Sequence, residues 1–317
     1  MHYVVGDIHG CYDKFMELLN RLNLKEDDVV ILLGDIIDRG EQSPQMLKWA
    51  MEHITTDGPF QMVRGNHEQA VVSDFEDTID LYENGDVRTG GNNTEFKSKY
   101  KDALDMCLHP LESHYGFKEY MEKEGYSTLR DLVPIVEFFR TLPLYKRLSV
   151  TDSNGRQKDF LIAHAWAYIG KDGNVEGSED TFLWERDVAI GGNYGWTAYN
   201  RFLDDFNPNG YGNPEEMLIH GHTPICKGNG YPVDFLIHKR ERSINLDCGA
   251  VFEGGRLAAY CLETDEVVYV EASEKEKMAI EERKEKERIE REKQIEESEK
   301  RILEYYERRE YELLMNI

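Results

Sequence analysis

Short runs of β-branched and aliphatic residues recur along this chain, and each run ends in a polar turn that usually contains glycine. Such runs are typical of strands that are buried on both faces of a sheet. Between the first three runs, residues 12–22 and 43–53 have the spacing of amphipathic helices, so the opening predicts a βαβαβ unit with a mostly parallel sheet. The runs are Tyr3–Val5, Val29–Leu33, Gln61–Val63, Phe160–Ala163, Met217–Ile219 and Ile244–Leu246.

Three segments depart from this alternation. Residues from about 72 to 146 have mainly helical patterns and predict a helical insertion beside the functional site. Residues 187–215 are rich in glycine, asparagine, proline and aromatic residues, as is typical of long loops that border binding sites. Residues 250–272, AVFEGGRLAAYCLETDEVVYVEA, alternate apolar and polar positions around two turns, which predicts a pair of hairpins completing a second sheet.

The composition changes abruptly at Glu271. The last 47 residues contain 16 acidic and 12 basic side chains and neither glycine nor proline, which predicts one long charged helix. The helix is interpreted either as solvated and stabilised by charge pairs four residues apart, or as docking on a partner or a second copy through the apolar cluster at 302–314. The predicted organisation is therefore a domain at 1–270 and an extension at 271–317.

Charge and composition limit the classes of partner. A net charge of −24 disfavours extended binding to nucleic acid or to an anionic membrane, although a small phosphorylated group drawn in by metal ions remains compatible. The five cysteines are scattered, without a CxxC pair, so neither a disulfide framework nor a zinc knuckle is indicated. No apolar run approaches about 18 residues, and the first residues lack the features of a signal peptide, so we expect a cytoplasmic protein.

Ligand-type side chains follow five of the predicted strands. Because the carboxyl ends of strands in an open α/β sheet meet at one crevice, residues remote in sequence are expected to become neighbours there. One histidine or aspartate after a strand is usually a turn residue, but five such ends favour a site for borderline divalent metals. The residues are, strand by strand, Asp7 and His9; Asp35, Asp38 and Arg39; Asn66, His67 and Glu68; His164; and His220 and His222.

The motifs GDIHG, GDIIDRG and GNHE occur in that order, and they resemble the signature blocks of the phosphoprotein-phosphatase branch of the calcineurin-like metallophosphoesterases. Later blocks are similar to bacterial and phage members, including symmetrical diadenosine tetraphosphatases: GGNNT at 90–94, FFRTLPLY at 138–145, LWERD at 183–187, GHTP at 221–224 and NLDCGAVFEGGRLAAY at 245–260. The resemblance covers about 1–270 and implies an α/β fold in which two mixed β-sheets, flanked by helices, form a sandwich.

The resemblance also implies a centre with two divalent metal ions. Its bridging carboxylate would be Asp35, which would keep the two ions about 3.5 Å apart so that they activate a shared water. Mn²⁺ is the first choice of metal, and Fe, Zn²⁺ and Ni²⁺ also tolerate such ligands. The implied ligands are Asp7 and His9 for one ion, Asp35 for both, and Asn66, His164 and His222 for the other.

Catalytic roles are implied for residues beside these ligands. His67 would protonate the leaving oxygen, Asp38 would orient His67, and Arg39 and Arg186 would clamp the phosphoryl oxygens. Glu68 and His220 are candidates to support the ligands from behind. Trp166 stands in His-Ala-Trp where many relatives have His-Ala-Gly, at a position expected to border the substrate.

These features favour a metal-dependent phosphomonoesterase of the bacterial Ser/Thr protein phosphatase type, acting on a phosphorylated protein or a small phosphoester. A symmetrical dinucleoside-tetraphosphate hydrolase is the alternative enzyme, and the acidic composition disfavours a polynucleotide-end phosphatase. A further alternative is a non-catalytic scaffold that recruits partners through the C-terminal helix. Scaffolds of this kind usually lose ligands, whereas all six implied ligands are present.

Overall fold

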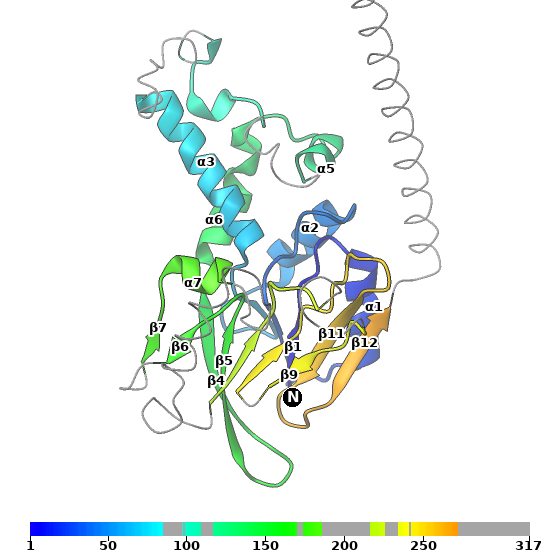
Figure 1. Ribbon diagram of the computed structural model, residues 1–317. Helices are drawn as coiled ribbons and strands as arrows, with labels where there is room; N and C mark the ends of the chain where they lie inside the picture. The colour runs from blue at the N-terminus through cyan, green and yellow to red at the C-terminus, as the bar shows by residue number, and fades with distance from the viewer. Residues whose placement is uncertain are drawn as a thin grey trace, which may run out of the picture. The chain divides into compact units, whose positions relative to one another are not determined.

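Residues 1–271 contain two five-stranded mixed sheets (Figure 1). This computed structural model describes residues 1–84, 97, 99–108, 117–169, 174–185, 216–225, 234–240 and 242–271. The predictions for the 187–215 loop, for the charged helix after residue 271 and for docking through 302–314 lie outside this part. No helix in the described ranges combines the length and the hydropathy needed to cross a membrane.

The first sheet has the strand order β12-β11-β1-β2-β3. Strands β1, β2 and β3 are parallel and are joined by helices α1 and α2, so the predicted βαβαβ opening is confirmed. The bounds are β1 (His2–Val5), α1 (Tyr12–Leu22), β2 (Val29–Leu32), α2 (Ser43–His53), β3 (Phe60–Met62), β11 (Arg256–Cys261) and β12 (Val267–Glu271).

The C-terminal hairpin corrects one prediction. Residues 250–272 contain one hairpin, β11 and β12, and it extends the first sheet rather than completing the second. The reason is that β2 occupies one edge of β1, while the other edge is taken antiparallel by β11, with Val4 opposite Tyr260. Helix α1 lies against this hairpin (Figure 1).

The second sheet has the strand order β4-β5-β8-β10-β9. Its central strands β5, β8 and β10 are parallel, and the edge strands β4 and β9 are antiparallel to their neighbours. The bounds are β4 (Tyr145–Thr151), β5 (Gln157–Ala163), β8 (Met217–His220), β9 (His238–Lys239) and β10 (Ser243–Asn245). The predicted strands at 160–163, 217–219 and 244–246 are thus confirmed within a few residues.

Side chains that alternate along the strands form separate apolar layers on the two faces of the sheet. In β2, Ile31 faces the second sheet and packs with Phe160 and Ile219, whereas Leu32 faces the helices and packs with Phe15. Successive strand residues point to opposite faces, so both faces of the sheet are buried. Because both faces are buried, these strands are continuous apolar runs in the sequence.

Helices α1 and α2 pack with the first sheet in one apolar cluster. Helix α3 begins at Asn66, before the predicted insertion at about 72, and packs against α6 (Figure 1). The remaining elements are α3 (Asn66–Asn84), the 3₁₀ turn η1 (Ala103–Asp105), α5 (Phe117–Lys123), α6 (Leu129–Thr141), the small sheet of β6 (Tyr168–Ile169) and β7 (Val175–Glu176), and α7 (Glu179–Trp184).

The first turn of α6 is held by a carboxylate. Asp131 Oδ2 accepts hydrogen bonds from the backbone N–H groups of Ser127 and Thr128, each at 2.9 Å, and these two bonds lower its pKa. We expect Asp131→Ala to lower the free energy of unfolding by about 1 kcal/mol at pH 7. Urea denaturation of both proteins measures the difference.

This contribution has a defined pH dependence. Because the folded-state pKa of Asp131 lies below the unfolded one, its stabilisation is full above the unfolded pKa, about 4. It is lost as the pH falls through the folded pKa, so the two proteins should converge in acid. Asp77→Ala on the exposed side of α3 is the control, and an equal loss there would contradict the assignment to the cap.

Candidate metal centre

The predicted ligands lie where the strands of both sheets end. Asp7 and His9 follow β1, Asp35 follows β2, and His164 follows β5 directly. His222 comes two residues after β8, and Asn66 begins α3 four residues after the end of β3. All six side chains are at most 7 % exposed. The sheets therefore bring together residues that are up to 215 positions apart.

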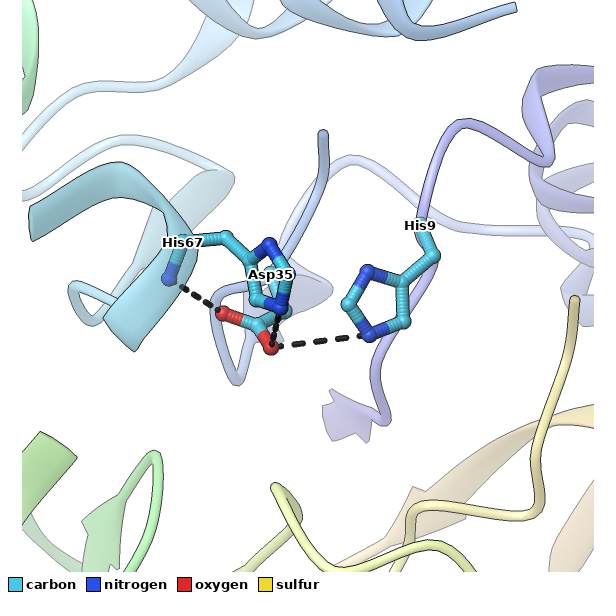
Figure 2. Close-up of side chains that lie close together, drawn as sticks. All are labelled: His9, Asp35 and His67. Atoms are coloured by element: carbon cyan, nitrogen blue, oxygen red, sulfur yellow. Dashed lines mark hydrogen bonds and ion pairs between the residues drawn. The ribbon is translucent and has the colours of Figure 1, made fainter. Parts of the chain in front are cut away.

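Asp35 lies at the middle of this arrangement. Its Oδ2 is 3.5 Å from His9 Nε2 and 3.8 Å from His67 Nε2, and its Oδ1 is 3.4 Å from His164 Nε2. The first two contacts are the dashed lines between Asp35 and the two rings in Figure 2. The backbone N–H of His67 donates to Oδ1 at 3.0 Å and fixes the carboxylate (Figure 2). Two groups of donor atoms therefore share this one carboxylate: His9, Asp35 and His67, and Asp35, His164 and His222.

The second group converges on Asn66. Its Oδ1 lies 2.9 Å from both His164 Nε2 and His222 Nδ1, and these two ring nitrogens are 3.2 Å apart. The rings of His164 and His222 meet edge to face, with centroids 5.1 Å apart. Oxygen and imidazole donors at this spacing suit a borderline divalent cation.

The hydrogen bonds of the histidines determine which ring nitrogens are available. His9 Nδ1–H donates to the carbonyl of Ile37 at 3.0 Å, and His164 Nδ1–H donates to that of Leu33 at 2.8 Å. Burial lowers the pKa of His9 to about 3 and also lowers the pKa of His164, so both rings are neutral at pH 7. Their Nε2 lone pairs therefore point into the site, as metal ligation requires.

These side chains fit a cation better than they fit one another. The Nε2 lone pair of His164 faces Asp35 Oδ1 and Asn66 Oδ1, so three acceptors meet without a proton among them. Asp7 Oδ1 is buried and has no hydrogen-bond partner among the residues that the structure describes. Buried acceptors are normally paired, so the arrangement is that of a site for positive charge.

Several negative charges are buried here. Burial and the charges of Asp247 and Asp35 raise the pKa of Asp7, although the backbone N–H of His222 donates to its Oδ2 at 3.0 Å. Burial would raise the pKa of Asp35 as well, but electrostatic interactions with the histidines around it, His164 first, lower it overall. Asp247 is 2 % exposed and is not among the residues predicted from the sequence, where its only signal is its place in the 245–260 block.

The predicted catalytic side chains lie on one side of Asp35. His67 Nδ1 makes a short hydrogen bond to Asp38 Oδ2. The guanidinium of Arg39 reaches both rings, with Nη1 at 2.8 Å from His9 Nε2 and Nη2 at 3.3 Å from His67 Nε2. Burial alone would lower the pKa of His67, but the charge of Asp35 and the bond to Asp38 raise it. Arg186, the second predicted clamp, lies outside the described residues.

Glu68 fastens two ligand loops to each other. It is fully buried, and its carboxylate accepts hydrogen bonds from the N–H groups of Asp35 at 2.8 Å, Ile36 at 2.9 Å and Gly65 at 2.9 Å. Burial and the charge of Asp35 raise its pKa to about 7. The structure thus places Glu68 behind Asp35.

Trp166 corrects another expectation. Its side chain is 2 % exposed and packs with Leu161, Leu218 and Phe182 in the apolar layer outside the second sheet, so it does not border an open substrate site. The backbone N–H groups of Ala165 and Trp166 donate to the carbonyls of Phe182 and Thr181 in α7, which ties this segment to the apolar layer. There the Trp166 ring meets the edge of the buried His220 ring, with centroids 5.1 Å apart, so His220 lies behind the centre.

Several residues of the candidate metal centre have strained backbone conformations. Eight non-glycine residues in the described ranges have a positive φ, and five of them are predicted site residues: His9, Asp35, Asp38, Arg39 and His222. Left-handed backbone at such residues costs about 1–3 kcal/mol each and persists where the surroundings require it. No local sequence pattern announced this feature, although aspartate and histidine tolerate the conformation better than most residues.

Gly221 leaves the space that Asp7 occupies. A Cβ at this position would lie 2.1 Å from Asp7 Oδ1, so Gly221→Ala must displace that carboxylate. We expect metal affinity to fall about 10-fold to 100-fold. Metal analysis of the dialysed protein, together with the rate of phosphoester hydrolysis, measures the effect.

The control for this substitution is Gly155→Ala. It has a φ of +78° and meets open space, so it should cost stability without changing metal content. Full metal occupancy in Gly221→Ala would show that Asp7 is not needed to hold the ion.

The calcineurin-like phosphoesterase family matches residues 3–226. The asymmetrical bis(5'-nucleosyl)-tetraphosphatase PrpE of Geobacillus sp. (strain WCH70) is 27 % identical over 85 % of this chain and 94 % of its own, and that of Bacillus subtilis (strain 168) is 24 % identical over 85 % and 94 %. A solved metallophosphoesterase from Sphaerobacter thermophilus aligns with 86 % of this chain and 88 % of its own, at 14 % identity and a TM-score of 0.42.

Proposed function

Because this chain belongs to the calcineurin-like phosphoesterase family, a family of hydrolases, we propose that it is a metal-dependent enzyme that cleaves dinucleoside tetraphosphates. The family match confirms the resemblance seen in the three opening motifs. One observation above all supports the proposed chemistry. The two groups of buried donor atoms share the carboxylate of Asp35, which lies where the strands end.

Six residues would hold the metal ions. Asp35 would belong to both ions, because its two oxygens face different histidines. When bound, two divalent cations activate the attacking water and neutralise charge on the phosphoryl oxygens, and we propose Mn²⁺ for this role. The remaining ligands in the proposal are Asp7, His9, Asn66, His164 and His222.

The neighbouring side chains supply the rest of the reaction. The guanidinium of Arg39 lies beside the rings of both His9 and His67. From this position it can donate hydrogen bonds to phosphoryl oxygens. As water adds to phosphorus and the bond to the leaving oxygen breaks, His67 gives its Nε2 proton to that oxygen. Asp38 keeps the Nδ1 proton in place and so orients the ring. Arg186 would be a second donor to the phosphate.

The substrate is proposed from the relatives that span most of the chain. Two relatives whose match covers 94 % of their own length bear the name asymmetrical bis(5'-nucleosyl)-tetraphosphatase. We propose the same cleavage here, in which attack at an outer phosphorus of diadenosine tetraphosphate gives AMP and ATP. Attack at an inner phosphorus, the symmetrical alternative, gives two ADP molecules.

A Ser/Thr phosphoprotein is the second candidate substrate, and the His67–Asp38 pair favours it. An alkoxide is a poor leaving group that needs a proton as it departs, whereas a nucleotide phosphate leaves more readily without one. A scaffold without catalysis is less well supported, because the six candidate ligands are present and buried together.

One experiment separates these functions. Full-length protein loaded with Mn²⁺ is incubated with diadenosine tetraphosphate and, separately, with a phosphoserine peptide, and the products are resolved by chromatography. We expect AMP and ATP from the dinucleotide. Release of phosphate from the peptide without cleavage of the dinucleotide would favour the second candidate, and a metal-loaded protein that turns over neither would contradict both.

A further inference from the structure

Trp184 is an exposed aromatic residue at the end of α7. The two residues before it, Phe182 and Leu183, are buried, but Trp184 is 47 % exposed. It is the most exposed of the large apolar side chains that the described ranges contain. Tryptophan is seldom left in water without a partner, because its ring offers a large apolar area for burial.

This ring lies beside the candidate metal centre. The Trp184 and His222 ring centroids are 6.4 Å apart, and the planes meet at 86°. His222 is in turn 2.9 Å from Asn66 and 3.2 Å from His164, so Trp184 stands at the rim of the second ligand group. The other tryptophan in this region, Trp166, is buried behind His220, so only one of the two is open to a ligand in the described part of the chain.

We propose that Trp184 is a specificity-determining residue on which a nucleobase of the substrate stacks while the adjoining phosphates lie at the ligand groups. This inference rests on the proposed function, because it requires a nucleotide substrate. Stacking of a base on an aromatic side chain tolerates any base, since every base has a π face. It would therefore serve an enzyme that accepts nucleosides generally.

A nucleobase fits this position better than the residues around a phosphoserine. The base is planar and uncharged, so it can cover the ring without opposing the negative charge of the protein. It is joined covalently to the phosphates, so the ligand groups and the ring would bind two parts of one molecule. The side chains beside a phosphoserine differ from one peptide to another and offer no constant flat face.

Substitutions of Trp184 test this proposed stacking platform, and the readout is a ratio of two activities. For full-length protein with Mn²⁺, kcat/KM is measured for diadenosine tetraphosphate and for inorganic tripolyphosphate, which has no base. We expect Trp184→Leu to lower the ratio of the first to the second about tenfold, within the range measured for base stacking, and Trp184→Phe to lower it about threefold at most. Tyr145→Leu removes another exposed aromatic ring, on β4, and should leave the ratio unchanged.

Fluorescence provides a readout that does not depend on turnover. The emission of Trp184 is obtained as the difference between the native protein and Trp184→Phe, since the chain has four tryptophans. We expect adenosine nucleotides to quench this difference in a saturable way and tripolyphosphate not to quench it. Because this assay needs only Trp184→Phe, it remains decisive if Trp184→Leu fails to fold.

The outcomes separate the two proposals. Quenching by the nucleotide without hydrolysis of any phosphate would support the platform and contradict the proposed reaction. Hydrolysis of the dinucleotide with an unchanged ratio in Trp184→Leu and no quenching would overturn the platform and leave the reaction standing. A loss confined to phosphopeptide hydrolysis would also overturn it, and would assign the ring to a protein substrate.

Discussion

Replacing Asp35 with asparagine is expected to reduce phosphoester hydrolysis by a factor on the order of 10³ or more and to empty both metal positions. The substitution keeps the shape of the side chain and an acceptor for the N–H of His67, but it removes the negative charge. The effect should be large because Asp35 faces His9 with one oxygen and His164 with the other. Each ion would lose a charged ligand that nothing else replaces.

Metal content and rate should therefore fall together in Asp35→Asn. The measurements are metal analysis of the dialysed protein and kcat/KM on one phosphoester at saturating Mn²⁺. The control is Asp152→Asn in the turn between β4 and β5, where the carboxylate accepts hydrogen bonds from the backbone N–H groups of Asn154 and Arg156. If Asp35→Asn kept two ions and a tenth of the activity, the bridging role would have to be abandoned.

The second large effect is expected at His67. His67→Gln should lower kcat about 10²-fold to 10⁴-fold on an alkyl phosphate, because its poor leaving oxygen would depart without a proton. The loss should be much smaller for a nitrophenyl phosphate, whose leaving group is stable as an anion. Metal content should not change, since the proposed role of the ring is to donate a proton.

The geometry makes this test informative. His67 lies with His9 and Asp35 in a group that could itself hold an ion, so ligation is the competing role for its ring. A ligand would show the opposite pattern: lost metal, and equal losses on both leaving groups. Asp38→Asn is the companion variant, because it disturbs the orientation of the His67 ring while leaving the ring itself in place.

The positions of the candidate ligands could be predicted because they depend on local patterns. Apolar runs marked the strand ends after which Asp7, Asp35 and His164 stand, and the burial of those strands follows from their β-branched residues. The structure also explains the glycine of the GHTP motif, because a Cβ on Gly221 would collide with Asp7. The convergence of these residues at one crevice then follows from the parallel topology.

The supporting interactions could not be predicted in the same way. Nothing local to Glu68 says that its carboxylate will bind three backbone N–H groups, because two of them belong to a loop more than thirty residues away. The influence of Asp247 on Asp7 likewise joins the two ends of the domain. Interactions of this kind exist only once the chain has folded.

By itself, the sequence determined six of the strands (β1, β2, β3, β5, β8 and β10), the order of the motifs and the chemical nature of the candidate ligands, because side-chain chemistry and short-range periodicity are properties of neighbouring residues. Only the tertiary structure decided that the hairpin at 256–271 joins the first sheet, that Trp166 is buried and that Trp184 is exposed. Sheet edges and helix faces that look equivalent in the sequence differ only in what the rest of the chain packs against them. That difference is set by contacts between distant residues.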